Sequence, residues 1–288
     1  MKRPVTGAIA FLCVFTFCTW AWADWGLNEA HKMHYPQLPD MSSHGLDVNA
    51  TFWGTPGNPS PPIFPFQKVL ADDWTCSSSG PVSDIHIWGS WLHDQKFTGT
   101  IFHLSIHADI PNSGLPGDYS RPGALLWEGF FDPGEYSQRI WGTTIGERVW
   151  DPNTGSFLGT DTLVWQYNFE DIPEPFTQQF GTTYWLDVQA LVPPSPSPTD
   201  PQFVFGWKTS ASPKWKDDAV YGDNDVFGAY PFPQFPDPSS PGGLTPWKDM
   251  HHPDNPNESI DLAFVITPEP ASLTLIGLAG AVLLLKRR

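Results

Sequence analysis

The chain has 288 residues, with 31 acidic residues against 15 basic ones, and a formal net charge of −16 at pH 7. This excess of negative charge argues against nucleic acid as a partner, because binding to a phosphate backbone requires basic patches. The 32 prolines and 15 tryptophans, together with few helix-type apolar patterns, indicate an all-β protein with long loops.

The first 23 residues have the features of a secretory signal peptide. Lys2 and Arg3 make a positive start, and an apolar stretch follows from Ile9 to Trp20. Ala21-Trp22-Ala23 is an A-x-A cleavage site, so signal peptidase is expected to cut before Asp24. The apolar stretch is short for a membrane span, which favours removal over retention as an anchor helix.

Residues 24–66 are rich in Pro, Asn, Gly and His. Five prolines between positions 56 and 65 argue against a long helix or a central strand in this segment. We therefore expect an extended lead-in that lies over the following domain, with the domain itself at residues 67–266.

After the lead-in, apolar and polar residues alternate in the manner of strands. Residues 99–110 are the clearest case, because Phe102 and Leu104 share one face whereas His103 and His107 share the other. This alternation predicts one buried face and one largely solvated face. The predicted strands cover residues 69–76, 82–91, 99–110, 124–131, 138–145, 162–169, 183–191, 202–209 and 260–266.

Many strands with turn signals between them, and no helical pattern in between, indicate a single antiparallel β-sandwich. A jelly-roll-like arrangement is the leading prediction, and an immunoglobulin-type stack is the alternative, although the body is long for one such module. Long Pro-rich loops are expected at residues 193–201 and 230–258. An N-terminal signal helix and a C-terminal hydrophobic helix would flank this domain.

Aromatic and histidine side chains on the strands are the first candidate ligand-binding groups. Trp88 shares a strand face with Asp84 and His86, and an aromatic ring beside polar groups can stack on a sugar. The alternative is a sheet buried on both faces, in which most tryptophans serve the core. His103 and His107 are too far apart along one strand to share a zinc ion. Solvated or cross-strand hydrogen-bonded histidines are the favoured interpretation.

An acidic loop is the second candidate site. Asp217, Asp218, Asp223, Asn224 and Asp225 fall within nine residues, and such oxygen donors suit calcium. Their order does not fit the EF-hand loop. A solvated turn, in which Asp and Asn favour the turn geometry, is the simpler interpretation. We therefore expect no cofactor, with calcium at this loop as the alternative.

The chain carries no recognisable catalytic motif. The patterns G-x-S-x-G and H-E-x-x-H are absent from the sequence. Glycoside hydrolysis requires two carboxylates at a set separation, and the candidate acids are scattered along the chain at Glu128, Glu135, Glu147, Glu170 and Glu174. The sequence therefore predicts no enzymatic activity.

The last 22 residues, 267–288, form a three-part tail. Pro268-Glu269-Pro270 precedes an apolar stretch from Ala271 to Leu285, and Lys286-Arg287-Arg288 ends the chain. A straight helix over this stretch covers roughly 22 Å, less than the ~30 Å hydrocarbon core of a bilayer. The stretch at 271–285 therefore suits transient retention in the inner membrane, with the basic end in the cytoplasm and the body outside.

This tail resembles the PEP-CTERM sorting signal. That signal occurs in Gram-negative bacteria that make exopolysaccharide, so the resemblance implies export to the cell surface or beyond. It also implies an exosortase-type membrane protease as the enzyme that processes the tail, in addition to signal peptidase at the other end.

The body carries a second resemblance. Residues 71–76, 81–90, 207–210 and 217–220 are similar to motifs of an uncharacterised β-rich domain that is common in PEP-CTERM proteins. The likeness covers about residues 65–266 and implies an extracellular β domain, without a known activity or known functional residues.

The expected function is that of an exported, non-catalytic cell-surface or extracellular-matrix protein, with extracellular polysaccharide as a partner. Two alternatives stay open: a secreted carbohydrate-active enzyme on a β-sandwich, and a calcium-dependent adhesin that acts through residues 217–225.

Overall fold

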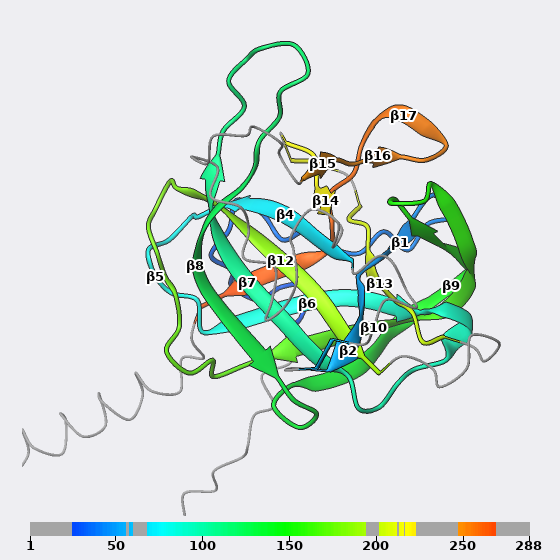
Figure 1. The fold of residues 1–288 in the computed structure, drawn as a ribbon. Helices are drawn as coiled ribbons and strands as arrows, with labels where there is room; N and C mark the ends of the chain where they lie inside the picture. The colour runs from blue at the N-terminus through cyan, green and yellow to red at the C-terminus, as the bar shows by residue number, and fades with distance from the viewer. Residues whose placement is uncertain are drawn as a thin grey trace, which may run out of the picture.

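The fold is known from a computed structural model, and the described part of it is all-β (Figure 1). The described residues are 25–55, 58–59, 68–193, 202–211, 213–215, 217–222 and 247–268. Within them the helical structure is a single 3₁₀ turn, η1 (Leu92–Asp94). None of these residues belongs to a helix long and apolar enough to cross a membrane. The predicted signal helix and hydrophobic tail helix lie outside the described residues.

Eighteen strands are assigned within the described residues. They are β1 (Leu46–Asn49), β2 (Thr51–Thr55), β3 (Asn58–Pro59), β4 (Val69–Thr75), β5 (Gly80–Pro81), β6 (Asp84–Trp91), β7 (Ile101–Ile110), β8 (Arg121–Phe131), β9 (Ser137–Asp151), β10 (Ser156–Phe169), β11 (Thr177–Gln178), β12 (Thr183–Val192), β13 (Phe205–Lys208), β14 (Val220–Gly222), β15 (Lys248–Asp249), β16 (His251–His252), β17 (Asn255–Ser259) and β18 (Phe264–Thr267).

Five strands close into a ring, which we call the barrel. β6 pairs with β10, β10 with β9, β9 with β1, and β1 with β13, which returns to β6. One edge of β6 is shared by two strands. β18 pairs with its N-terminal half, and β13 pairs with its C-terminal half. Ring closure gives each of the five strands a partner on both edges, so none of them presents an open edge.

The second sheet forms the other layer of the sandwich. β8, β7, β12 and β4 follow one another in antiparallel order, and β14 and β15 extend the sheet beyond β4. β2 pairs with the C-terminal end of β12. Figure 1 shows β8, β7, β12 and β4 side by side as one layer against the barrel strands. The layered sandwich is therefore confirmed.

Aromatic side chains fill the space between the two layers. Phe102 of β7 lies at the centre, with ring centroids of Tyr136, Tyr167, Phe169 and Phe205 between 4.8 and 5.5 Å away. Most of these contacts are edge-on or tilted, the geometry that aromatic rings prefer over a face-to-face stack. Because the four partners come from the barrel side, Phe102 joins the second sheet to the barrel.

Two expectations about the N-terminal part of the body are wrong. Residues 46–55 are not a lead-in, because β1 is a ring strand paired on both edges and β2 belongs to the second sheet. The prolines that argued against a strand begin only at position 56, after β2 has ended. The sheets are also not purely antiparallel, since β1 pairs with β9 and β2 with β12 in parallel.

The expectation of solvated strand faces is also wrong. His103 and His107 are 4% and 0% exposed, and Trp88, with Asp84 and His86 beside it, is fully buried. The histidines instead bond across strands, as the favoured interpretation proposed: His103 Nδ1 lies 3.0 Å from the Gln189 amide oxygen, and His86 Nδ1 lies 2.8 Å from the Asn168 amide oxygen. Both faces of these strands are therefore buried.

We expect Phe102→Ala to lower the free energy of unfolding by about 3–5 kcal/mol, because it removes a fully buried ring and leaves a cavity. Urea unfolding followed by tryptophan fluorescence measures this change. The matched control is Phe180→Ala, since Phe180 is 73% exposed and its loss should leave the unfolding midpoint unchanged. Equal effects of the two substitutions would contradict the assignment of the core.

Candidate functional site

Each of the five barrel strands places one polar side chain in a single buried group. They are Ser90 of β6, Asp47 of β1, Lys208 of β13, Glu147 of β9 and Asp161 of β10. Asp47 lies opposite Lys208 across one antiparallel pair, and Asp161 lies opposite Glu147 across another. Residues directly opposite in a pair point to the same face of the sheet. We call this group the barrel cluster.

The barrel cluster lies on the inner face of the ring. Phe205 and Trp207 alternate with Lys208 along β13, and Phe205 packs against Phe102 of the second sheet. The face that carries Phe205 is therefore the outer face, toward the other layer of the sandwich. Because successive residues of a strand point to opposite faces, Lys208 and its partner Asp47 point into the ring.

Burial of the cluster is nearly complete and its charge is unbalanced. Asp47 and Lys208 are 0% exposed, Asp161 is 2% and Glu147 is 6%. One carboxylate oxygen from each of the three acids lies within 4.8 Å of the others. Lys208 Nζ contacts Glu147 Oε1. Within the described part of the ring, Lys208 is the one lysine whose ammonium group faces the three acids.

Hydrogen bonds compensate these carboxylates only in part. Neither carboxylate oxygen of Asp161 has a hydrogen-bond partner among the described residues, and the same holds for Glu147 Oε2. A buried carboxylate without donors is unfavourable as an anion. The lone pairs of Asp161 are therefore available to a ligand inside the ring.

The pKa values of the three acids move in the direction that burial dictates. Burial, and secondarily the charge of Asp47, raises the pKa of Glu147 to about 8, although Lys208 acts against this rise. Burial raises the pKa of Asp161 to about 9, with the charges of Asp47 and Glu147 adding to the effect. Burial also raises the pKa of Asp47, against the opposing effects of Lys208 and the Ser90 hydroxyl. Without a further positive charge, the cluster therefore retains protons.

A second buried acid, Asp72, accepts several hydrogen bonds, although burial and the charges of Asp261 and Asp73 raise its pKa. Asp72 Oδ2 accepts hydrogen bonds from Gln37 Nε2 at 2.7 Å and from the Leu262 backbone N–H at 2.6 Å. Its Oδ1 accepts one from the Asp73 backbone N–H at 2.8 Å. Asp72 thus ties three segments together and has a structural role. Asp161 has no such partners, which sets the barrel cluster apart.

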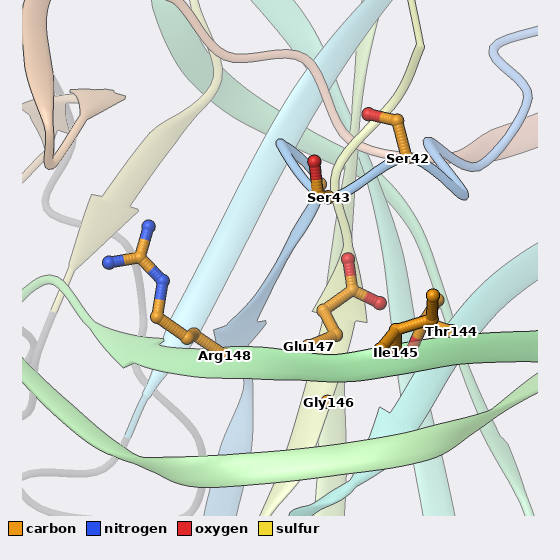
Figure 2. Close-up of a pocket in the computed structure, with 8 residues that line it drawn as sticks. Ser42, Ser43, Thr144, Ile145, Gly146, Glu147 and Arg148 are labelled. Atoms are coloured by element: carbon orange, nitrogen blue, oxygen red, sulfur yellow. The ribbon is translucent and has the colours of Figure 1, made fainter.

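A small pocket at the surface reaches one member of the cluster, Glu147. It has a volume of about 120 Å³ and is lined by Ser42, Ser43 and Gly45 on one side and by residues 144–148 on the other. Figure 2 shows Glu147 extending from β9 toward the Ser42–Ser43 turn, whereas Arg148 points away. Glu147 therefore belongs both to the pocket wall and to the barrel cluster.

Gly45 allows the turn to approach the cluster closely. A Cβ atom at this position would lie 2.3 Å from the Asp40 carbonyl oxygen, 2.6 Å from Glu147 Oε1 and 2.7 Å from Lys208 Nζ. The first of these atoms is backbone and cannot move aside. Only glycine fits at this boundary between pocket and cluster.

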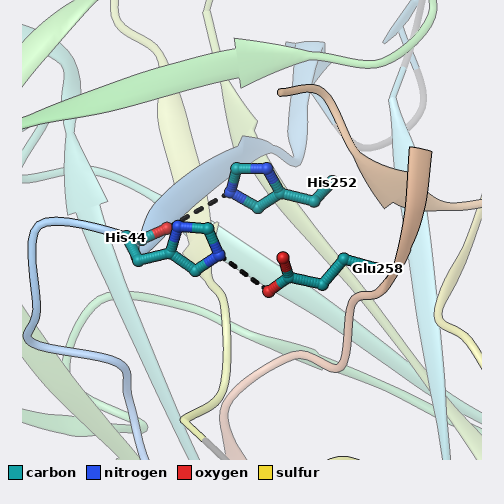
Figure 3. Close-up of side chains that lie close together, drawn as sticks. All are labelled: His44, His252 and Glu258. Carbon is teal, nitrogen blue, oxygen red and sulfur yellow. Dashed lines mark hydrogen bonds and ion pairs between the residues drawn. The ribbon is translucent and has the colours of Figure 1, made fainter. Parts of the chain in front are cut away.

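The hairpin of β16 and β17 contacts His44, which lies between two pocket-lining residues, and we call this contact the rim (Figure 3). His44 Nε2 lies 2.7 Å from Glu258 Oε1, and the rings of His44 and His252 stack with centroids 4.3 Å apart. His252 Nδ1 accepts a hydrogen bond from the Asp254 backbone N–H, so its Nε2 donates to the His44 carbonyl oxygen. Both ring nitrogens of His252 are thus occupied, which argues against a metal ion at this rim despite the proximity of the three side chains.

The predicted acidic loop is only partly described. Asp218 Oδ2 lies 3.3 Å from His251 Nδ1, and His251 Nε2 lies 3.0 Å from Asp249 Oδ2. Asp217 is not a member of this group, and Asp223, Asn224 and Asp225 lie outside the described residues. A histidine that bridges two carboxylates differs from the all-oxygen environment that calcium prefers.

The other predicted site residues divide into two groups. Asp84, His86 and Trp88 are brought together on β6, but they are 3%, 2% and 0% exposed and present no surface to a sugar. The sorting motif is described only at Pro268. The residues of the predicted processing sites that lie outside the described part of the chain are Ala21, Ala23, Asp24, Glu269 and Pro270.

Sequence reasoning did not identify the barrel cluster. The sequence pattern marks Glu147 only as one of several candidate acids that are scattered along the chain. It marks Lys208 only as part of the motif at residues 207–210. The available signal was a charged residue between apolar ones in a short strand, as in Leu46-Asp47-Val48. That signal does not reveal that the polar face is enclosed, because enclosure depends on strands far apart in the sequence.

We expect Gly45→Ala to destabilise the protein by about 1–3 kcal/mol, since the new methyl group overlaps the Asp40 backbone and the cluster. Thermal unfolding measures the loss. The matched control is Gly26→Ala, where the nearest atom would lie 3.6 Å from the new Cβ and no change is expected. A fully stable G45A protein would contradict the close approach.

We expect His44→Ala to raise the pKa of Glu258. The hydrogen bond from His44 is the main cause that holds the pKa of Glu258 below its ordinary value of 4.5. A lowered carboxylate pKa stabilises the fold above the unfolded-state value, and this stabilisation is lost as the pH falls through the folded-state value. An NMR titration of the side-chain carboxyl carbons measures the shift. An unchanged Glu258 titration in H44A would show that this pair does not form in solution.

Comparison with known proteins places the chain in a family. A family model described as "Domain of unknown function (DUF7901)" matches residues 33–267, which include every barrel strand and both strands β1 and β2 of the supposed lead-in. No curated protein and no solved structure matches the chain. The match spans most of the sequence, and the chain therefore belongs to the DUF7901 family.

Proposed function

We propose that the protein is an exported, non-catalytic component of the cell surface or extracellular matrix, sorted by a PEP-CTERM-type tail. The observation that carries this proposal is the order of three features at the end of the chain. Pro268-Glu269-Pro270 comes first, an apolar stretch at 271–285 follows, and Lys286-Arg287-Arg288 is last. A signal peptide at residues 1–23 supplies the matching export signal at the other end.

The proposal includes the two end helices and a jelly-roll-like arrangement of the strands in the layered body. In this view the signal helix directs export and is removed by signal peptidase. The tail helix holds the protein in the inner membrane until an exosortase-type protease acts on it. The folded body then associates with extracellular polysaccharide at the cell surface.

The geometry of the pocket supports a non-catalytic role over a carbohydrate-active enzyme. Pockets that bind small organic molecules have volumes of roughly 300–1,000 Å³, whereas the pocket at Glu147 has about 120 Å³. The carboxylates beyond it are enclosed by the ring. A glycosidic bond would therefore not reach two of them at once. Adhesion through calcium at residues 217–225 is also less well supported, because His251 occupies Asp218.

The test is the intact mass of the protein recovered from its native host. We expect the chain to begin at Asp24 and to lack the apolar stretch and basic end of the tail. A variant with Glu269→Ala serves as the control and should retain the tail in the membrane fraction. Mature protein that still carries Leu273 to Arg288, or that fractionates with the cytosol, would refute the proposal.

A second measurement tests the expected partner. The mature protein should bind the polysaccharide of its own host in a pull-down with purified polymer, and this binding should be unaffected by D161N, because Asp161 is enclosed by the barrel. Absence of binding would remove polysaccharide as a partner and leave a purely structural role at the surface.

A further inference from the structure

We propose that the barrel binds one calcium ion between Asp47, Glu147 and Asp161. The site lies inside the ring, apart from the predicted acidic loop at 217–225, and it does not depend on how the tail is processed. Three arguments support it: the donor set, the charge of the cluster and the space for water beside Glu147.

The donor set is that of a hard cation. The three acids offer oxygen atoms only, and one oxygen from each lies within 4.8 Å of the others. Calcium–oxygen distances of 2.3–2.6 Å allow ligands up to roughly 4.6–5.2 Å apart around one ion, and calcium accepts irregular oxygen shells that magnesium, with its near-ideal octahedral geometry, does not. The absence of His and Cys from this group disfavours zinc.

The charge of the cluster requires a cation or protons. Were all three carboxylates ionised beside the single ammonium of Lys208, two negative charges would be uncompensated in a buried space. A divalent ion would neutralise the group and let all three acids remain ionised. Asp161 gives independent support for a bound cation. Its side chain is only 2% exposed, and neither of its carboxylate oxygens accepts a hydrogen bond from the described residues.

The pocket places space for water beside one of the proposed ligands, Glu147. Its volume of about 120 Å³ accommodates a few water molecules at roughly 30 Å³ each. Calcium takes six to eight oxygen ligands, so waters would complete the shell provided by three carboxylates. The cationic groups at the rim do not repel an entering ion, since Arg148 pairs with Asp254 and His44 pairs with Glu258.

The experiment uses the full purified chain, first treated with EDTA and then passed into chelator-free buffer. The probes are Ca²⁺ and Mg²⁺ alone at millimolar concentration. We expect the wild type to bind one calcium per chain by atomic emission and to gain roughly 5–10 °C in Tm at a hundredfold excess over Kd. Magnesium should give a smaller shift.

The decisive variant is Asp161→Asn, which keeps the shape of the side chain and removes one charge. In EDTA it should melt at or above the wild-type temperature, because it relieves repulsion in the cluster, and it should show no calcium-dependent shift. If D161N does not fold, Glu147→Gln takes its place, with the same expected loss. The matched control, Asp218→Asn, should retain the full calcium shift.

Three results would overturn the proposal. The first is a wild type that shows neither bound calcium nor a calcium-dependent Tm. The second is a shift that is lost in D218N but kept in D161N, which would place the ion at the acidic loop. The third is an intact mass lower by one water, which would show an amide bond between Lys208 and Glu147 in place of an ion site. None of these results bears on export or on the tail.

Discussion

Closure of five strands into a ring is the constraint on which the rest of this structure depends. A closed ring has no edge and leaves an inner face that water does not reach freely. The outer face of β6 and β13 must then pack against the second sheet, which Phe205 does through Phe102. Any polar residue on the inner face has to find its compensation within the ring. The close grouping of Asp47, Glu147, Asp161 and Lys208 in a buried space is a consequence of this closure.

Burial of both strand faces explains why so many polar side chains lie inside this protein. Most of them are compensated by partners on neighbouring strands, as His103 is by Gln189 and as Asp72 is by backbone donors. Such pairs cost little, because each buried polar atom keeps a hydrogen bond. The barrel cluster departs from this pattern, since neither carboxylate oxygen of Asp161 has a hydrogen-bond donor. An uncompensated group of this kind persists only where a ligand or bound protons offset its cost.

One segment of the chain links the surface to the interior of the ring. Within four residues it passes from His44 at the hairpin rim, through Gly45 at the pocket wall, to Asp47 inside the barrel. The hairpin of β16 and β17 holds the outer end of this segment in place. His44 and Asp47 are thus joined by a short stretch of backbone that is closely packed at Gly45.

The all-β class, the single sandwich and the positions of most strands followed from the sequence by itself, because period-2 alternation is a local property of the chain. The patterns that predict an export signal and a sorting tail at the two ends are equally local. Only the tertiary structure decided that β1 and β2 belong to the sheets, that two pairings are parallel and that His86, His103 and His107 are buried. It alone also assembled the cluster, since Asp47 and Lys208 are 161 residues apart and meet only through strand pairing. Alternation states which residues share a face, but enclosure of that face depends on the closure of the ring.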